Sequence, residues 1–79
     1  RAAALRVGIV EGEARRALDY VEDASAEVDL NLVASAEGEI IEVQGTAEEK
    51  PFTRAQLDAM LEVGLSGIAR LVEVQRSVL

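Results

Sequence analysis

Residues 27–46 decide the fold, and they read EVDLNLVASAEGEIIEVQGT. Apolar and polar side chains alternate along the first half of this stretch, which is the pattern of a strand with one solvated face. A turn signal follows at Glu37-Gly38, and a second apolar run begins at Ile40. The stretch therefore predicts an antiparallel hairpin whose strands cover about residues 27–35 and 40–46.

The register of this hairpin follows from centring its loop on Glu37-Gly38. On one face of the hairpin apolar residues then meet apolar residues, and on the other face polar residues meet polar ones. The expected apolar pairs are Leu32 with Val43 and Ala34 with Ile41, and the expected polar pairs are Asn31 with Gln44 and Asp29 with Thr46.

Two further strands are expected before the hairpin. Leu5, Val7 and Ile9 are separated by single residues, which predicts a half-buried strand over about residues 4–10. Glu11-Gly12 then supplies a turn, and a strand over about 13–20 follows it. The buried face of this strand over 13–20 is not defined by its sequence.

A long helix is expected after the hairpin. Thr53 and Gln56 have the spacing of a capping box, which predicts a helix over about residues 54–78. Gly64 and Gly67 interrupt its apolar stripe, and we interpret them as positions of close backbone approach. One core is expected, in which Leu61, Leu65, Ile68 and Val72 of the helix pack against Leu30, Leu32, Ile41 and Val43 of the hairpin.

The predicted fold is therefore of the α+β class: a four-stranded, largely antiparallel sheet covered on one face by a long C-terminal helix. The 79 residues fit one small domain. Because the chain begins at Arg1 and enters an apolar run at once, we interpret residues 1–79 as a single partial domain of a longer protein.

Composition excludes several classes of function. The chain has no Cys and no His, so thiolate chemistry, His-ligated zinc and Ser-His-Asp catalysis are ruled out. Its net charge of −7 opposes unassisted binding to a polyanion, so any action on nucleic acid needs basic groups from elsewhere. No stretch is apolar enough to span a bilayer, and a soluble, cytoplasmic protein is expected.

The candidate site residues are two aspartates. Asp29 lies inside a predicted strand, where carboxylates are rare, and Asp23 precedes that strand by a few residues. Magnesium takes oxygen ligands, usually one or two carboxylates plus water and substrate phosphate, so the pair is compatible with a magnesium site. From the pattern alone, the alternation favours a plain solvated strand face for Asp29 over a metal site.

Other polar residues carry weaker signals. Glu42 has the pattern of a solvated strand residue. Gln44-Gly45-Thr46 could turn an amide and a hydroxyl toward a ligand, or mark the bend where the strand leaves the sheet. Arg15 and Arg16 are adjacent, so at most one of them can join any given face, and we interpret both as surface charges.

Five motifs in order resemble the C-terminal part of ribonuclease PH, the bacterial family of phosphorolytic exoribonucleases. They cover nearly the whole chain, and the helix is similar as well, through Leu57, Gly67-Ile68, Leu71 and Gln75. The motifs are Val7 to Gly12, Asp19-Tyr20 with Glu22-Asp23, Ala26 to Asn31, Glu42 to Glu48, and Pro51-Phe52-Thr53.

The resemblance implies a 3′ to 5′ exoribonuclease in which orthophosphate attacks the RNA 3′ end and releases a nucleoside diphosphate. It also implies that Asp23 and Asp29 are the catalytic, metal-binding aspartates, with magnesium as the cofactor. The implied partners are the RNA 3′ end, with tRNA processing as the setting, and other subunits of a homo-oligomer.

The sequence departs from the family pattern at two positions close to these aspartates. Ala24 stands where the family usually has Ser, and Val21 where an acidic residue is common. The phosphate-binding and RNA-contacting segments of the family lie in its N-terminal part and have no match here, so the chain by itself is expected to be inactive. The competing hypothesis is a non-catalytic, excised or redesigned module that self-associates through exposed strand edges.

Overall fold

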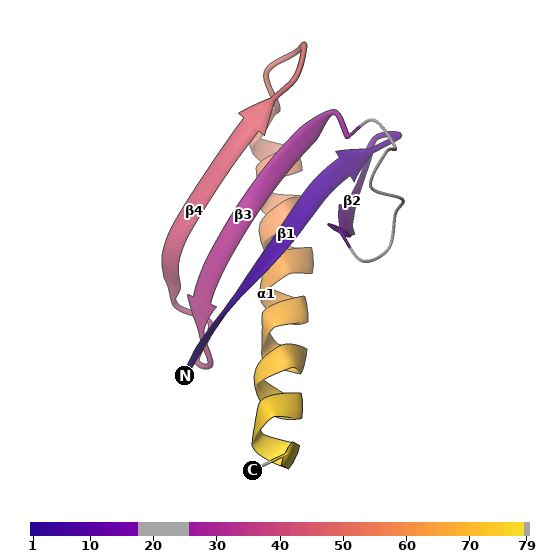
Figure 1. Ribbon diagram of the computed structural model, residues 1–79. Coiled ribbons are helices and arrows are strands. Elements are labelled where there is room, and N and C mark those ends of the chain that lie inside the picture. Colours follow the sequence, from indigo (N-terminus) through magenta and orange to yellow (C-terminus); the bar gives the residue numbers. More distant parts are fainter. Residues whose placement is uncertain (18–25, 79) are drawn as a thin grey trace.

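The computed structural model describes residues 1–17 and 26–78, with side chains up to Gln75. Its fold is α+β, as predicted: a four-stranded antiparallel sheet and one C-terminal helix (Figure 1). The elements are β1 (Ala2–Val10), β2 (Glu13–Arg16), β3 (Val28–Ser35), β4 (Ile40–Ala47) and α1 (Arg54–Val78). No helix in these described ranges is long and apolar enough to cross a membrane.

The strands lie in the order β2-β1-β3-β4, and all neighbours pair antiparallel. β1 pairs with β2 through a tight turn, in which Glu11 and Gly12 both have positive φ, 52° and 82°. β2 ends at Arg16, whereas the sequence predicted a strand over about 13–20. Residues 18–20 of that predicted range lie outside the described part of the chain.

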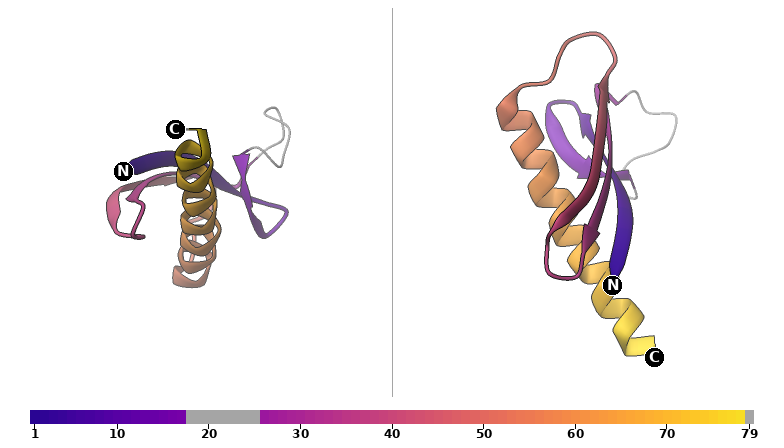
Figure 2. Two further views of the ribbon diagram at one scale, coloured as in Figure 1. Left: turned by 90° about the horizontal axis from the view of Figure 1, so that it is seen from below. Right: turned by 90° about the vertical axis from the view of Figure 1, so that its left-hand side faces the viewer.

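Helix α1 runs along one side of the sheet, and the core lies between them (Figure 2). The buried apolar residues come from β1, β3 and α1 and are Val7, Ile9, Val28, Leu30, Leu32, Ala34, Met60, Ile68 and Val72. The predicted contribution of Ile68 and Val72 to one core with Leu30 and Leu32 is confirmed, while Leu61 and Leu65 are only partly buried at its margin.

The two helix glycines lie where α1 approaches the sheet. A Cβ atom added at Gly64 would lie 2.6 Å from a Leu32 methyl carbon, and one added at Gly67 would lie 2.5 Å from a Leu5 methyl carbon. Both distances are shorter than a normal carbon contact. The interpretation of these glycines as positions of close approach is therefore confirmed.

The predicted packing of β4 beneath the helix is wrong. Val43 does lie opposite Leu32 and on its face, but Val43 is 46% exposed and Ile41 is 62% exposed. The reason is that α1 packs against β1, β2 and β3, so the outermost strand β4 extends beyond the helix. β4 is instead covered at one point by Phe52, whose ring would meet a Cβ added at Gly45.

The hairpin register is confirmed for three of the four predicted pairs: Leu32 with Val43, Asn31 with Gln44, and Asp29 with Thr46. The fourth is wrong, because Ala34 lies opposite Ile40 and not Ile41. The register shifts between Val33 and Ala34, where β4 carries one extra residue in a β-bulge.

The connection from β4 to α1 ends in the predicted capping box. The Thr53 amide donates to Gln56 Oε1 at 2.8 Å, and the Gln56 amide donates to Thr53 Oγ1 at 3.1 Å. These two bonds satisfy amide groups that the first helical turn leaves without backbone partners.

Candidate functional site

The polar residues of the sheet gather on the face turned away from α1. Alternation along β3 sends Leu30 and Leu32 into the core, and therefore turns Asp29 and Asn31 to the other side. Strand pairing extends this outer face into two rows of directly opposite residues. One row is Arg6, Asn31 and Gln44, and the next is Arg15, Gly8, Asp29 and Thr46.

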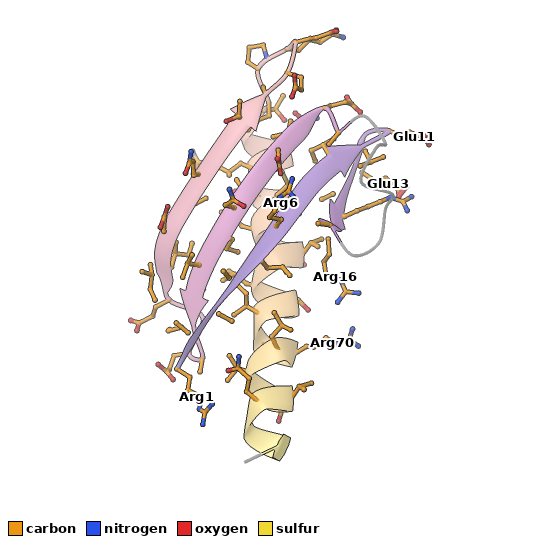
Figure 3. The ribbon with its side chains drawn as sticks, viewed as in Figure 1. Arg1, Arg6, Glu11, Glu13, Arg16 and Arg70 are labelled. Carbon is orange, nitrogen blue, oxygen red and sulfur yellow. The ribbon has the colours of Figure 1, made fainter. Side chains whose placement is uncertain are left out.

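Asp29 and Arg6 form an ion pair in the middle of this face. Arg6 Nη2 donates to Asp29 Oδ2 at 2.9 Å, and the two side chains are 51% and 43% exposed, in the order Arg6 and Asp29. Figure 3 shows Arg6 over the centre of the sheet, whereas Arg16 and Arg70 lie beside α1. An exposed pair of this kind adds at most about 1 kcal/mol to stability.

The second carboxylate oxygen of Asp29, Oδ1, has a different environment. Oδ1 is buried and has no hydrogen-bond partner among residues 1–17 and 26–78. A buried oxygen that bears part of a negative charge is costly without a donor or a cation beside it. The outer face therefore holds one carboxylate oxygen that is paired with Arg6 and one that is suited to a further ligand.

The neighbours of Asp29 across the sheet differ on its two sides. Gly8 on β1 has no side chain, and Thr46 on β4 brings a hydroxyl group to the same face. Beyond Gly8 lies Arg15, whose guanidinium is 3.5 Å from Glu13 Oε1. Arg6 on β1 and Arg15 on β2 thus lie on the same side of Asp29, and each is paired with a carboxylate, Arg6 with Asp29 and Arg15 with Glu13.

The backbone around Glu27 fixes the start of β3 and so the position of Asp29. The Glu27 amide donates to the Ile9 carbonyl at 2.8 Å, and its own carbonyl accepts from the Glu48 amide at 3.1 Å. Its side chain accepts from the Gly12 amide at 3.0 Å. Glu27 therefore ties β3 to both neighbouring strands and to the β1–β2 turn.

The structure describes only one of the two predicted metal-binding aspartates. Asp23 lies outside the described residues, so its distance from Asp29 is not defined. Among the described residues, no three acidic side chains come together in a way that could hold a metal ion. Of the predicted aspartate pair, the structure therefore gives the position of Asp29 and not of Asp23.

Gln44-Gly45-Thr46 is not a bend, because β4 continues to Ala47. Gln44 and Thr46 share the outer face with Asp29, and Gly45 faces the core side, where it leaves room for Phe52. Arg15 and Arg16 divide as expected: Arg15 is on the outer face, while Arg16 pairs with buried Val7 and packs its stem near Gly67.

A hollow of about 470 Å³ lies elsewhere, between the start of β3 and the segment that leads into α1. Its lining includes one basic residue, Lys50, beside Glu27 and Glu49. Asp29 is not part of this lining, so the hollow and the carboxylate are two separate features.

Arg6 is the site residue that sequence reasoning missed. Its position between apolar strand residues indicated only a solvated side chain. The signal is tertiary: β1 and β3 are separated by a long connection, and only their pairing sets Arg6 opposite Asn31 and diagonal to Asp29.

Comparison with known protein families gives a match that covers most of the chain. Residues 1–67 match the family model described as the 3′ exoribonuclease family, domain 2. The matched range contains all four strands, the capping box and the first half of α1.

Proposed function

Because this chain belongs to the 3′ exoribonuclease family and corresponds to its domain 2, we propose that it is the acid-bearing part of a 3′ to 5′ phosphorolytic exoribonuclease. In this reaction an oxygen of orthophosphate attacks the 3′-terminal phosphodiester of RNA. The bond to the preceding nucleotide breaks, and a nucleoside diphosphate leaves. The site residues that we assign to this chain are Asp23 and Asp29.

The observation that carries the proposal is the environment of Asp29 Oδ1, an oxygen that is buried, unpartnered within the described ranges, and part of a polar sheet face. An anionic oxygen of this kind is the donor that magnesium prefers. Asp29 therefore fits the ion as one ligand, and we assign Asp23 as the second ligand from the family resemblance. When bound, magnesium would neutralise charge on the phosphate oxygens during in-line displacement.

The arginines of the outer face have a different role in this proposal. Arg6 holds Asp29 Oδ2 and so keeps the carboxylate in one orientation, with Oδ1 turned into the face. Arg6 is paired with Asp29 and Arg15 with Glu13, so these arginines orient carboxylates and add no net positive charge that would attract an anionic substrate. The remaining groups that bind orthophosphate and RNA would come from the N-terminal part of the family's architecture.

The proposal is tested by substituting Asp29 by Asn, which keeps the shape of the side chain and removes its charge. An ion that binds only the folded state stabilises it by about 2.7 kcal/mol at a hundred times Kd, and with two protein ligands at most the gain at millimolar magnesium is expected to be smaller. Wild type should melt at a higher temperature as magnesium is added, and Asp29→Asn should not.

The matched control is Glu42→Gln. Glu42 is on β4, on the same outer face of the sheet as Asp29, so this variant removes one negative charge from that face and leaves Asp29 intact. A monovalent salt series of equal ionic strength subtracts general screening of the −7 charge. Equal magnesium responses in wild type, Asp29→Asn and Glu42→Gln would show that Asp29 is a solvated strand residue, and the metal role would be rejected.

A further inference from the structure

Two exposed side-chain amides lie beside Asp29 on the outer face of the sheet. Asn31 on β3 is directly opposite Gln44 on β4, so their Cβ atoms are about 5 Å apart. Asn31 follows Asp29 by two residues on the same face of β3, a separation of about 7 Å along the strand. A ligand held at Asp29 is therefore within reach of both amides.

The residue type at position 31 is unusual for its place in the sheet. β3 is an inner strand, between β1 and β4, and Asn and Asp are both depleted from strands. Asn31 and Asp29 nevertheless occupy alternate positions of one face of this strand. Two unfavourable residue types side by side indicate a surface that serves a ligand more than it serves strand stability.

The chemistry of a carboxamide indicates which group that ligand presents. Each amide is uncharged and has one acceptor oxygen and two N–H donors. A phosphate oxygen only accepts, and it is bound most strongly by cations. A hydroxyl both donates and accepts, so it can donate to one amide of the pair and accept from the other.

In RNA the hydroxyl that meets this description is the ribose 2′-hydroxyl, which is also the group that distinguishes RNA from DNA. The edge of a base can likewise donate and accept. An exonuclease, however, removes nucleotides in succession and meets every base in turn, so a pair of amides that recognised one base would slow it at the others. The ribose is the part of the substrate that stays the same at each step.

We propose that Asn31 and Gln44 bind the 2′-hydroxyl of the nucleotide on the 5′ side of the scissile phosphate and make the site selective for RNA. This inference rests on the proposed function, because it requires the scissile phosphate to be held at Asp29. The 2′-hydroxyl is on the carbon next to the one that carries the 3′-oxygen of that phosphate. A ribose beside Asp29 therefore extends over the neighbouring row of the outer face, which contains Asn31 and Gln44.

The first test follows the side-chain amides of the 79-residue chain by NMR. The chain has four carboxamides, Asn31, Gln44, Gln56 and Gln75, and their NH₂ signals report contacts separately. The probe is the ribodinucleotide ApA at millimolar concentration with magnesium, compared with the analogue that lacks only the 2′-hydroxyl of its first nucleotide. A dinucleotide has one phosphate, so the net charge of −7 opposes its binding less than that of longer RNA.

We expect ApA to shift the signals of Asn31 and Gln44, and the deoxy analogue to bind about 3–10-fold more weakly, as for the loss of a hydrogen bond. Gln56 and Gln75 are internal controls. Gln56 is held in the capping box, and Gln75 lies near the C-terminal end of α1, so neither signal should move.

The second test separates recognition of the ribose from stability. Asn31→Val introduces a residue that favours strands and cannot form a hydrogen bond. The variant should melt at a temperature no lower than wild type, and its preference for ApA over the deoxy analogue should disappear. Gln75→Ala is the matched control, because it removes an amide from α1, and it should keep the preference.

The outcomes distinguish this inference from the metal role of Asp29. Shifts of Asn31 and Gln44 that depend on the 2′-hydroxyl and are lost in Asn31→Val support it. Equal binding of the two dinucleotides, an unchanged preference in Asn31→Val, or no shift of the two signals would overturn it. A magnesium titration without dinucleotide reports on Asp29 alone, so a magnesium response without selectivity for ribose would reject this inference and leave the proposed function standing.

Discussion

At the scale of single residues, the contact between Arg6 and Asp29 determines how much of the carboxylate is open to a cation. Arg6 occupies Oδ2, and Oδ1 remains without a partner in the described part of the chain. A guanidinium and a metal ion compete for the same negative charge. If Asp29 binds magnesium as proposed, Arg6 both orients the carboxylate and lowers its affinity for the ion.

We predict that Arg6→Gln strengthens the magnesium response. The variant should lose less than about 1 kcal/mol of stability without the ion, because the pair is half exposed. It should then show a larger rise in melting temperature than wild type over the same magnesium series. Arg70→Gln is the control, since it removes the same charge from α1, far from the outer face (Figure 3). Equal responses of the two variants would show that Arg6 does not compete for Asp29.

The two helix glycines should respond differently to alanine. At Gly64 the added methyl meets Leu32, which is fully buried and unable to move freely, whereas at Gly67 it meets partly buried Leu5 and the stem of Arg16. Overpacking costs ~1–3 kcal/mol, and replacing Gly by Ala in a helix returns ~1 kcal/mol. Gly64→Ala should therefore be destabilised, and Gly67→Ala should be near neutral, as measured by urea unfolding. The reverse order would show that Leu32 repacks easily.

At the scale of elements, the sheet and α1 depend on each other through Ile68. This residue is 1% exposed and lies between Gly64 and Val72 on the face that covers the sheet. Ile68→Ala should cost ~2–5 kcal/mol in thermal or urea unfolding, enough to unfold much of so small a domain. Val74→Ala, on a part of α1 that extends past the sheet, should change stability by less than about 0.5 kcal/mol. An Ile68→Ala variant as stable as wild type would contradict the observed packing.

Local signals explain which elements could be predicted. The hairpin turn at Glu37-Gly38 and the capping box at Thr53 depend on residues close in sequence, and both were located correctly. Alternation in β3 likewise indicated which face of the sheet is polar, and so placed Asp29 there. The class of fold and the face of the candidate site were therefore available from the sequence.

The remaining features depend on how elements lie across one another. Alternation shows which face of β4 is apolar, but not that α1 passes over β1 and β3 and leaves Val43 exposed. The bulge beside Ile40-Ile41 moves the partner of Ala34 by one residue, and the turn residues Glu37-Gly38 carry no signal for it. Arg6 was missed for the same reason, because its contact with Asp29 exists only after β1 has paired with β3.

At the scale of the whole molecule, charge limits what the chain can do alone. Fifteen acidic and eight basic residues leave it strongly negative, and orthophosphate and RNA are negative as well. We predict that the purified chain releases no nucleoside diphosphate from a short RNA in the presence of phosphate and magnesium. Adding the separately purified N-terminal domain of a member of the family should restore release of nucleoside diphosphate. Asp29→Asn should prevent that restoration. Magnesium-dependent product from the chain alone would show that its site is complete.

The order of the elements along the chain has a consequence for the time at which this domain can form. β1 is made first, yet its partner β3 begins only at Val28, and the residues that close the core, Met60, Ile68 and Val72, belong to the last element. Among the described elements, α1 is the one that covers the apolar side of the sheet, so this side stays uncovered during synthesis until most of α1 has left the ribosome. A nascent chain halted before Ile68 has left the ribosome should remain open to proteases, while one halted after Val72 has left it should resist them.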